Sequence, residues 1–281
     1  MAKKTSKKII TKDQSKPLRF VGVSLSGGRS DRACLAVVEY FPKQERFFLT
    51  RLFEKIKTDD ESSADQKIIN IIHQYKDSLE LVAFDSPISL PKCISCKLKC
   101  PGYEVCQEPE LKWFRKFFDK INLKKKPKKF FLPYSQRCVD AYLNYTNEEG
   151  VNVHHALGAN LAPLTARALY LQKRIDIKCV EIQPHISVVR LGKQLKIAKS
   201  QLTSFHHQMG GDEVRKNFLN QIIEKKNIFI YQQDYKSMIE NNHAFEAFIS
   251  SYVAYLDFHH QTETRPEGFP PDEAWVAIPN L

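Results

Sequence analysis

The pattern of apolar and polar residues predicts a strand-rich first third of the chain. Segments 18–26, 32–41 and 45–53 are typical of three successive strands joined by short turns, an antiparallel meander. A helical pattern follows in SADQKIINIIHQY, where isoleucines supply the apolar face. The next run, LELVAFD, is apolar until it ends in Asp85, as expected of a central strand buried on both faces.

Beyond residue 134 the pattern alternates between helices and strands. IKCVEIQ is predicted to be a strand, and SVVRLG is interpreted as its hairpin partner. Helices are expected in PELKWFRKFFDKI, which Pro109 would begin, and at 135–148, 156–174, 211–226 and 233–260. This order predicts an α/β fold with one mixed sheet flanked by helices.

The expected organisation is a tail, one domain and one insertion. Residues 1–17 form a basic flexible tail, and residues 18–281 form a single domain. A cysteine- and lysine-rich insertion, residues 88–134, interrupts the domain after the fourth strand. The closing segment, which contains Trp275, is expected to pack in an extended form across the domain.

The net charge of +11 is concentrated in the tail and in one lysine cluster. That cluster consists of Lys124, Lys125, Lys126, Lys128 and Lys129. Such clusters suit nucleic-acid phosphates, although a solubilising tail and a solvated loop explain the charge equally well. No stretch approaches the roughly 20 apolar residues of a membrane span, and the N-terminus lacks the apolar core of a signal peptide. We therefore expect a cytoplasmic protein with no membrane partner.

Four cysteines lie close together in CISCKLKCPGYEVC. Cys93, Cys96, Cys100 and Cys106 have the spacing C-x2-C-x3-C-x5-C. In a reducing compartment this pattern favours a structural metal over disulfides or free thiols. The compact spacing and the Cys-Pro pair resemble ferredoxin-type ligation of a 4Fe-4S cluster, whereas all-cysteine zinc sites are commoner as small structural sites. We therefore expect zinc first and an iron–sulfur cluster second.

Polar residues occupy positions where a buried strand or helix would carry apolar ones. Ser24 lies at the centre of the first strand, and Asp85 precedes Ser-Pro at the end of the fourth. Glu181 lies within an apolar strand, where a carboxylate is costly unless it binds a cation or a donor. Glu246 lies in the last long helix. Each acid alone is more often a cap or an ion-pair partner, but together they are candidates for one site.

The sequence resembles the domain-of-unknown-function family 429, whose members are predicted nucleases of the ribonuclease H-like fold. The matching motifs span residues 20–281: VGVSLSGGRSDR, VAFDSPISLP, ALGANLAPLTARAL, VEIQPHISV, FEAFISSYVAYL and TETRPEGFPPDEAWVAIP. The resemblance implies a mixed sheet of five strands in ribonuclease H order. It also implies that acidic residues of the first strand, the fourth strand and the late helix hold divalent cations, Mg²⁺ or Mn²⁺, for phosphodiester cleavage.

By this resemblance Asp85, Glu181 and Glu246 match the catalytic acids, and His243 occupies the place of a further acid. Ser24 departs from the pattern, because it stands where the family carries the first-strand aspartate. If the hairpin were symmetric about Gly27 and Gly28, Asp31 would lie opposite Ser24 and supply the missing carboxylate. His185 is a candidate for contacting substrate.

Three functions follow as hypotheses. The first is a metal-dependent nuclease that binds nucleic acid through its basic segments. The second is an inactive module of the same fold that binds nucleic acid or protein, which the loss of the first-strand acid favours. The third is a sugar-kinase or actin-like protein, in which SLSGGRS would form a phosphate-binding backbone nest. The absence of a second phosphate hairpin and of an adenosine-binding Gly-Gly segment counts against the third.

Overall fold

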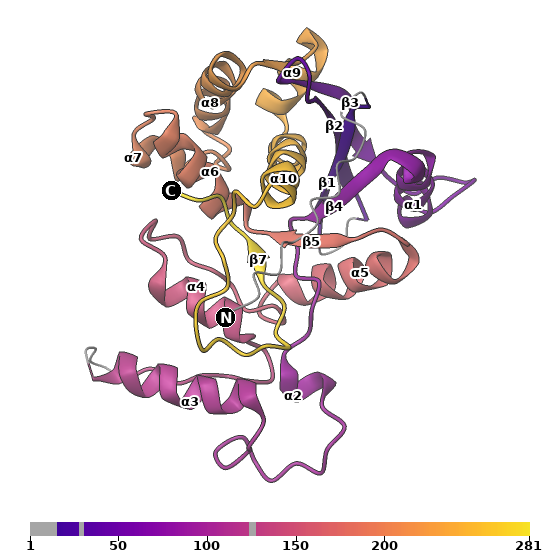
Figure 1. Cartoon of the computed structure of the whole chain (residues 1–281). Helices are drawn as coiled ribbons and strands as arrows, with labels where there is room; N and C mark the ends of the chain where they lie inside the picture. Colours follow the sequence, from indigo (N-terminus) through magenta and orange to yellow (C-terminus); the bar gives the residue numbers. More distant parts are fainter. Residues whose placement is uncertain (1–15, 28–30, 124–127) are drawn as a thin grey trace, which may run out of the picture.

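A computed structural model describes residues 16–27, 31–123 and 128–281 (Figure 1). Most of the predicted basic tail, together with Lys124, Lys125 and Lys126, lies outside the described residues. The strands are β1 (Leu18–Leu25), β2 (Ala33–Phe41), β3 (Arg46–Ile56), β4 (Leu79–Phe84), β5 (Cys179–Ile182), β6 (Ile228–Phe229) and β7 (Val276–Ala277). The helices are α1 (Ala64–Gln74), the 3-10 turn η1 (Lys76–Ser78), α2 (Lys92–Ser95), α3 (Pro109–Asn122), α4 (Cys138–Thr146), α5 (Leu161–Arg174), α6 (Pro184–Gln194), α7 (Lys199–Leu202), α8 (Gly211–Lys226), α9 (Gln232–Glu240) and α10 (Asn242–Phe258).

The strands form one mixed sheet in the order β6-β3-β2-β1-β4-β5-β7. β2 is antiparallel to β1 and β3, while β4 is parallel to β1 and β5. The predicted meander, the following helix and the buried fourth strand are confirmed. The sheet has seven strands rather than five, because β6 and β7, of two residues each, add to its edges.

Two local predictions are wrong. SVVRLG is not a strand but the middle of α6, which begins at Pro184 and is buried on nearly every side from Ile186 to Gly192. A helix buried all round has no polar face, so its periodicity is hidden. The expected helix at 233–260 is two helices, since Asn241 ends α9 and caps α10 by accepting a hydrogen bond from the backbone of His243 at 3.0 Å.

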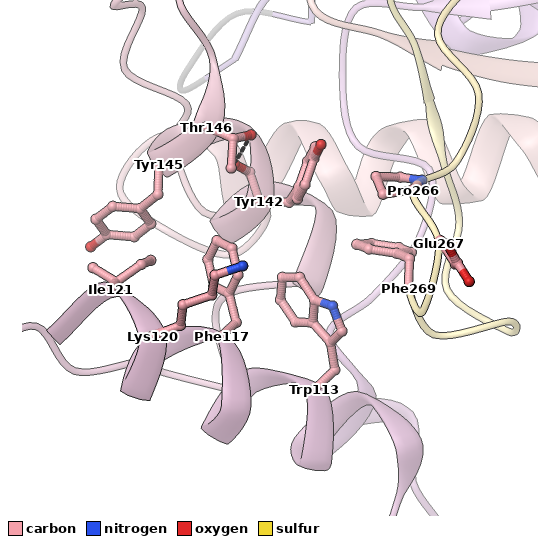
Figure 2. Close-up of a pocket in the computed structure, with 10 residues that line it drawn as sticks. All are labelled: Trp113, Phe117, Lys120, Ile121, Tyr142, Tyr145, Thr146, Pro266, Glu267 and Phe269. Atoms are coloured by element: carbon pink, nitrogen blue, oxygen red, sulfur yellow. Dashed lines mark hydrogen bonds between the residues drawn. The ribbon is translucent and has the colours of Figure 1, made fainter. Parts of the chain in front are cut away.

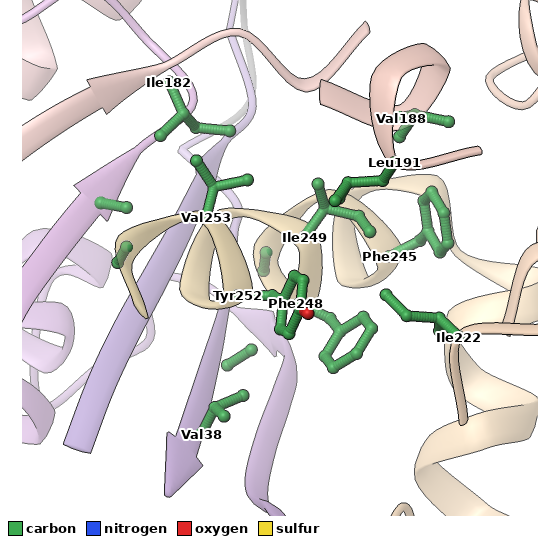
Figure 3. Close-up of a cluster of buried hydrophobic side chains, with 14 of the residues drawn as sticks. Val38, Ile182, Val188, Leu191, Ile222, Phe245, Phe248, Ile249, Tyr252 and Val253 are labelled. Carbon is green, nitrogen blue, oxygen red and sulfur yellow. The ribbon is translucent and has the colours of Figure 1, made fainter. Parts of the chain in front are cut away.

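Helices cover both faces of the sheet (Figure 1). On one face α1 and α5 pack against Val21, Val23 and Leu25 of β1. On the other face α10 packs against Phe20, and Figure 3 shows α10 between sheet residues such as Val38 and Ile182 and the helices that carry Leu191 and Ile222. Because side chains alternate along a strand, Gly22 and Ser24 share the α10 face with Phe20.

Helix α10 approaches β1 unusually closely at Gly22. A Cβ atom at this position would lie 2.0 Å from the carbonyl oxygen of Ala247 and 2.4 Å from the backbone nitrogen of Ser251. Neither contact is possible for a real side chain, so only glycine allows this packing. The small residues of α10 therefore lie directly on the backbone of the central strand.

A third apolar cluster joins α3 and α4 to the C-terminal segment. Phe114 and Phe118 of α3 pack with Val139 of α4 and with Phe269 and Ile278 near the end of the chain. The segment around Trp275 does cross the domain in an extended form, and β7 lies within it. None of the helices in the described ranges is both long and apolar enough to span a membrane.

Candidate metal-binding site

Asp85 is held at the carboxyl end of β4, next to β1. Its backbone N–H donates to the carbonyl of Val23 at 3.1 Å, which continues the parallel pairing by one residue. Its carboxylate oxygen Oδ1 accepts hydrogen bonds from the backbone of Leu25 at 3.2 Å and from the hydroxyl of Ser86 at 2.9 Å. These contacts fix the carboxylate at the sheet edge.

His243 and Glu246 lie on the first turns of α10, facing the same edge. They are three residues apart, so they share one face of the helix, and His243 Nδ1 lies 3.4 Å from Glu246 Oε2. The side chain of Glu246 is 9% exposed and that of His243 is 43% exposed. The pair therefore presents one buried acid and one accessible imidazole to the end of β4.

These three side chains converge. One ligand atom from each of Asp85, His243 and Glu246 lies within 4.8 Å of the others. All three line a cavity of about 490 Å³, whose wall also contains His185 and His206. Of the predicted acids, the structure thus brings Asp85 and Glu246 together, joined by His243, and His185 lines the same cavity.

Ser24 lies beneath this group and is fully buried. Its hydroxyl oxygen is 2.9 Å from His243 Nδ1, and it donates to Glu246 Oε2 at 3.4 Å. A hydrogen bond from Ser24 also acts on Asp85, whose pKa it lowers against the effect of burial. The first-strand hydroxyl is therefore a hydrogen-bond partner of all three side chains.

The prediction that Asp31 lies opposite Ser24 is wrong. The register pairs Ser24 with Cys34 and Leu25 with Ala33, so a longer connection than the symmetric turn separates the strands. Asp31 is exposed, and its carboxylate accepts a hydrogen bond from the backbone of Thr58 at 3.1 Å. It contributes nothing to the carboxylate group around Ser24.

Burial and mutual contacts shift the pKa values of Asp85, Glu246 and His243. Burial raises the pKa of Asp85 to about 6, and the nearby charge of Glu246 acts in the same direction. Burial also opposes ionisation of Glu246, but the hydrogen bond and charge of His243 outweigh it and lower the pKa of Glu246. The hydrogen bond to Glu246 raises the pKa of His243 in return. Within the described residues, no lysine or arginine forms an ion pair with Asp85 or Glu246.

Glu181 is not part of this group, although it lies on the neighbouring strand. Both of its carboxylate oxygens accept from the guanidinium of Arg137, each at 2.6 Å. The oxygen Oε2 also accepts from the backbone of Ile88 at 3.0 Å. The prediction that Glu181 joins Asp85 and Glu246 is therefore corrected, since both of its carboxylate oxygens are already paired with Arg137.

Arg137 was not identified from the sequence. It is 1% exposed and also pairs with Asp140, at 2.7 Å from Nη2 to Oδ1. Asp140 in turn accepts from the backbone of Ala156 at 3.0 Å. This network ties α4 to β5. An isolated arginine in SQRCVD carries no sequence signal that would identify a partner 44 residues away.

An aromatic groove lies apart from the acidic site, between α3, α4 and the C-terminal segment (Figure 2). Its volume is about 400 Å³, and Trp113, Phe117, Tyr142 and Phe269 line it together with Lys120. Trp113 and Phe117 are stacked, with ring centroids 4.5 Å apart. Of the predicted lysine cluster, Lys128 and Lys129 fall within the described residues and are exposed near the end of α3.

The four clustered cysteines come together as predicted. Cys93, Cys96, Cys100 and Cys106 are free thiols that line one cavity of about 280 Å³. The other three cysteines, Cys34, Cys138 and Cys179, lie elsewhere in the fold as isolated residues.

Comparison with known proteins identifies no relative of this chain: no family model, curated sequence or solved structure matches it significantly.

Proposed function

We propose that this protein is a divalent-metal-dependent nuclease with a ribonuclease H-like fold. One observation carries the proposal: the ligand atoms of Asp85, His243 and Glu246 lie within 4.8 Å of one another at the wall of an open cavity. The central strand order β3-β2-β1-β4-β5 and the motifs shared with predicted nucleases support the same assignment.

The donor set suits a divalent cation. Two carboxylates and one imidazole fit Mn²⁺ better than Mg²⁺, because Mg²⁺ prefers oxygen ligands alone. A cation bound there would activate a water molecule and stabilise the leaving oxygen of a phosphodiester. The residues Asp85 and Glu246 supply charge, while Ser24 orients His243 and Glu246 through its hydroxyl.

The other histidines of the cavity have a place in this scheme. Burial lowers the pKa of both His185 and His206, so these imidazoles are neutral at pH 7. A neutral imidazole can accept a proton from an attacking water. We assign that role to His185, the more buried of the two.

The aromatic groove favours a nucleic acid over a small phosphodiester as substrate. Bases stack on exposed aromatic rings in proteins that bind single strands, and lysines nearby contact the phosphates. Trp113, Phe117 and Lys120 offer this combination on α3, and Lys128 and Lys129 extend the positive charge beyond it.

Cleavage of a panel of DNA and RNA substrates in Mn²⁺ or Mg²⁺ tests the proposal. The wild type is expected to cleave with Mn²⁺, Asp85→Asn and Glu246→Gln to lose at least ~100-fold in rate, and His207→Ala to retain activity. His207 is the matched control because it is exposed and does not line the cavity.

Ser24→Asp separates an enzyme from a binding module. If the wild type is inert and Ser24→Asp acquires cleavage that depends on Asp85, the protein is an inactive member of the fold. If neither cleaves and the wild type binds no Mn²⁺, the metal-dependent function is wrong altogether.

A further inference from the structure

The cysteine-rich segment projects from the domain and has little apolar core of its own (Figure 1). It runs from α2 into the loop before α3. Ile94, Leu98 and Val105 are 52%, 65% and 58% exposed, so burial of these side chains contributes little to its folding. A segment of this kind needs another source of stability.

The loop is nevertheless ordered around its cysteines. Arg115 of α3 donates to the backbone carbonyls of Tyr103 and Cys106 at 2.7 and 2.6 Å. Gly102, at φ +93°, allows a tight turn in which its carbonyl accepts a hydrogen bond from the backbone N–H of Cys106 at 3.0 Å. The result is one cavity with a thiol from each of the four cysteines in its wall.

The separation of the thiols distinguishes the two metal centres that the sequence left open. Zinc bonds to sulfur at about 2.3 Å in a tetrahedron, which places the four sulfurs about 3.8 Å from one another. No three of the four cysteine sulfurs come within 4.8 Å of one another. Within the described residues, that closeness is reached only by the ligand atoms of Asp85, His243 and Glu246. The four cysteines therefore line one cavity with their sulfurs further apart than a single zinc ion requires.

An iron–sulfur cubane has the opposite requirement. Its iron and sulfide atoms fill the centre, and its four cysteine sulfurs stand outside them, about 6 Å apart. We propose that Cys93, Cys96, Cys100 and Cys106 bind a 4Fe-4S cluster that holds the segment in place. This reverses the order of preference that the sequence alone suggested.

One hydrogen bond fits this assignment. The backbone N–H of Gly102 donates to Cys100 Sγ at 3.4 Å. Backbone N–H groups directed at cysteine sulfur are among the contacts that set the properties of such clusters. The site is separate from the acidic cavity, because the two cavities share no lining residue.

Anaerobic purification of the full chain, followed by analysis of iron, acid-labile sulfide and zinc, tests the proposal. We expect about four irons and about four sulfides per chain, with a broad absorption band near ~400 nm that bleaches on reduction. One zinc per chain without iron, or no iron and sulfide after anaerobic reconstitution with Fe²⁺ and sulfide, would overturn it.

Variants locate the cluster. Cys93→Ser and Cys100→Ser are expected to lose iron and the absorption band, whereas Cys179→Ser, a change at an isolated cysteine, retains both. Retention of the full cluster by both clustered variants would contradict the assignment. Mn²⁺ binding to the acidic cavity is measured on the same samples. It is expected to persist when the cluster is lost, so failure of this proposal is distinguishable from failure of the nuclease proposal.

Discussion

Two groups of acids meet near the ends of the neighbouring strands β4 and β5, and their charges are compensated differently. Glu181 and Asp140 share the guanidinium of Arg137, which pairs with both through fork-like hydrogen bonds. The ligand atoms of Asp85 and Glu246 lie within 4.8 Å of each other and of His243, and burial raises the pKa of Asp85 to about 6.

The difference indicates which group is structural. A buried carboxylate is stable when a cation and hydrogen bonds compensate its charge, as Arg137 does for Glu181. Among the described residues no lysine or arginine pairs with Asp85 or Glu246, whose cationic neighbour is the imidazole of His243, and both acids line a cavity that Glu181 does not line. In the network of Arg137, the protein itself supplies the cation that pairs with the acids. In the group of Asp85 and Glu246, the residues are those of a site that binds a cation from solution.

The largest effect is expected from Arg137→Met. The change leaves Asp140 and Glu181 buried without a cation, so the free energy of unfolding should fall by about 3–5 kcal/mol. Denaturant unfolding measures it, with the exposed Arg174→Met as control. Adding Glu181→Gln to Arg137→Met should recover part of the loss. A loss below about 1 kcal/mol would mean that this network is not the structural one.

Glu246→Gln should act mainly on metal binding and less on folding. Removing one charged ligand is expected to weaken Mn²⁺ binding by at least ~100-fold, as measured by calorimetry. The metal-free protein should also unfold at a lower temperature at pH 7, because the lowered pKa of Glu246 means that its ionised form stabilises the folded state. His207→Ala should bind as the wild type does. An unchanged affinity in Glu246→Gln would show that the acids do not hold the cation.

Asp85→Asn should stabilise the metal-free protein. A pKa raised from 3.8 to about 6 means that the folded state holds the proton more tightly than the unfolded state does. The wild type therefore loses stability as the pH rises from about 4 to about 6, and above that range the asparagine variant should be more stable by about 3 kcal/mol.

Thermal unfolding as a function of pH checks the sign, with the exposed Asp176→Asn as control. Saturating Mn²⁺ should reverse the order, because it stabilises only the protein that binds it. If Asp85→Asn is less stable than the wild type at every pH without metal, ionised Asp85 does not destabilise the folded protein. The proposed difference from the Arg137 network is then wrong.

The smallest effect is expected from Ser24→Ala. The hydroxyl orients His243 and Glu246 without belonging to the three converging ligands, so its loss should weaken Mn²⁺ binding by about 10-fold. Binding isotherms of Ser24→Ala and Glu246→Gln, measured side by side, give the ratio. An equal loss in both would place the serine oxygen on the cation itself.

Sequence patterns predicted the central strands well, because their apolar runs follow from burial on both faces. They also singled out Asp85 and Glu246, since a polar residue at the end of a buried strand or on a buried helix needs a reason to be there. His243 followed only from the resemblance to a known family. The α6 segment was misassigned because Val188 and Val189 are typical of strands, and burial all round removed the helical period.

Other features depend on contacts that local sequence does not encode. The role of Asp31 rested on an assumed turn length, and a change in register changes every cross-strand neighbour. Arg137 pairs with Glu181 although the two residues are 44 positions apart in the sequence. The separation of the four cysteine sulfurs likewise depends on how the loop folds, so the sequence left the choice of metal to the greater frequency of all-cysteine zinc sites.

The missing side chain at Gly22 sets a limit on how this protein can evolve. The carbonyl of Ala247 occupies the space that any Cβ at position 22 would need, and Ala247 directly follows Glu246 in α10. A larger residue there would move the helix, and with it both His243 and Glu246, away from Asp85. A lineage that lost this one glycine would lose the arrangement of the three ligands while every ligand remained in its sequence.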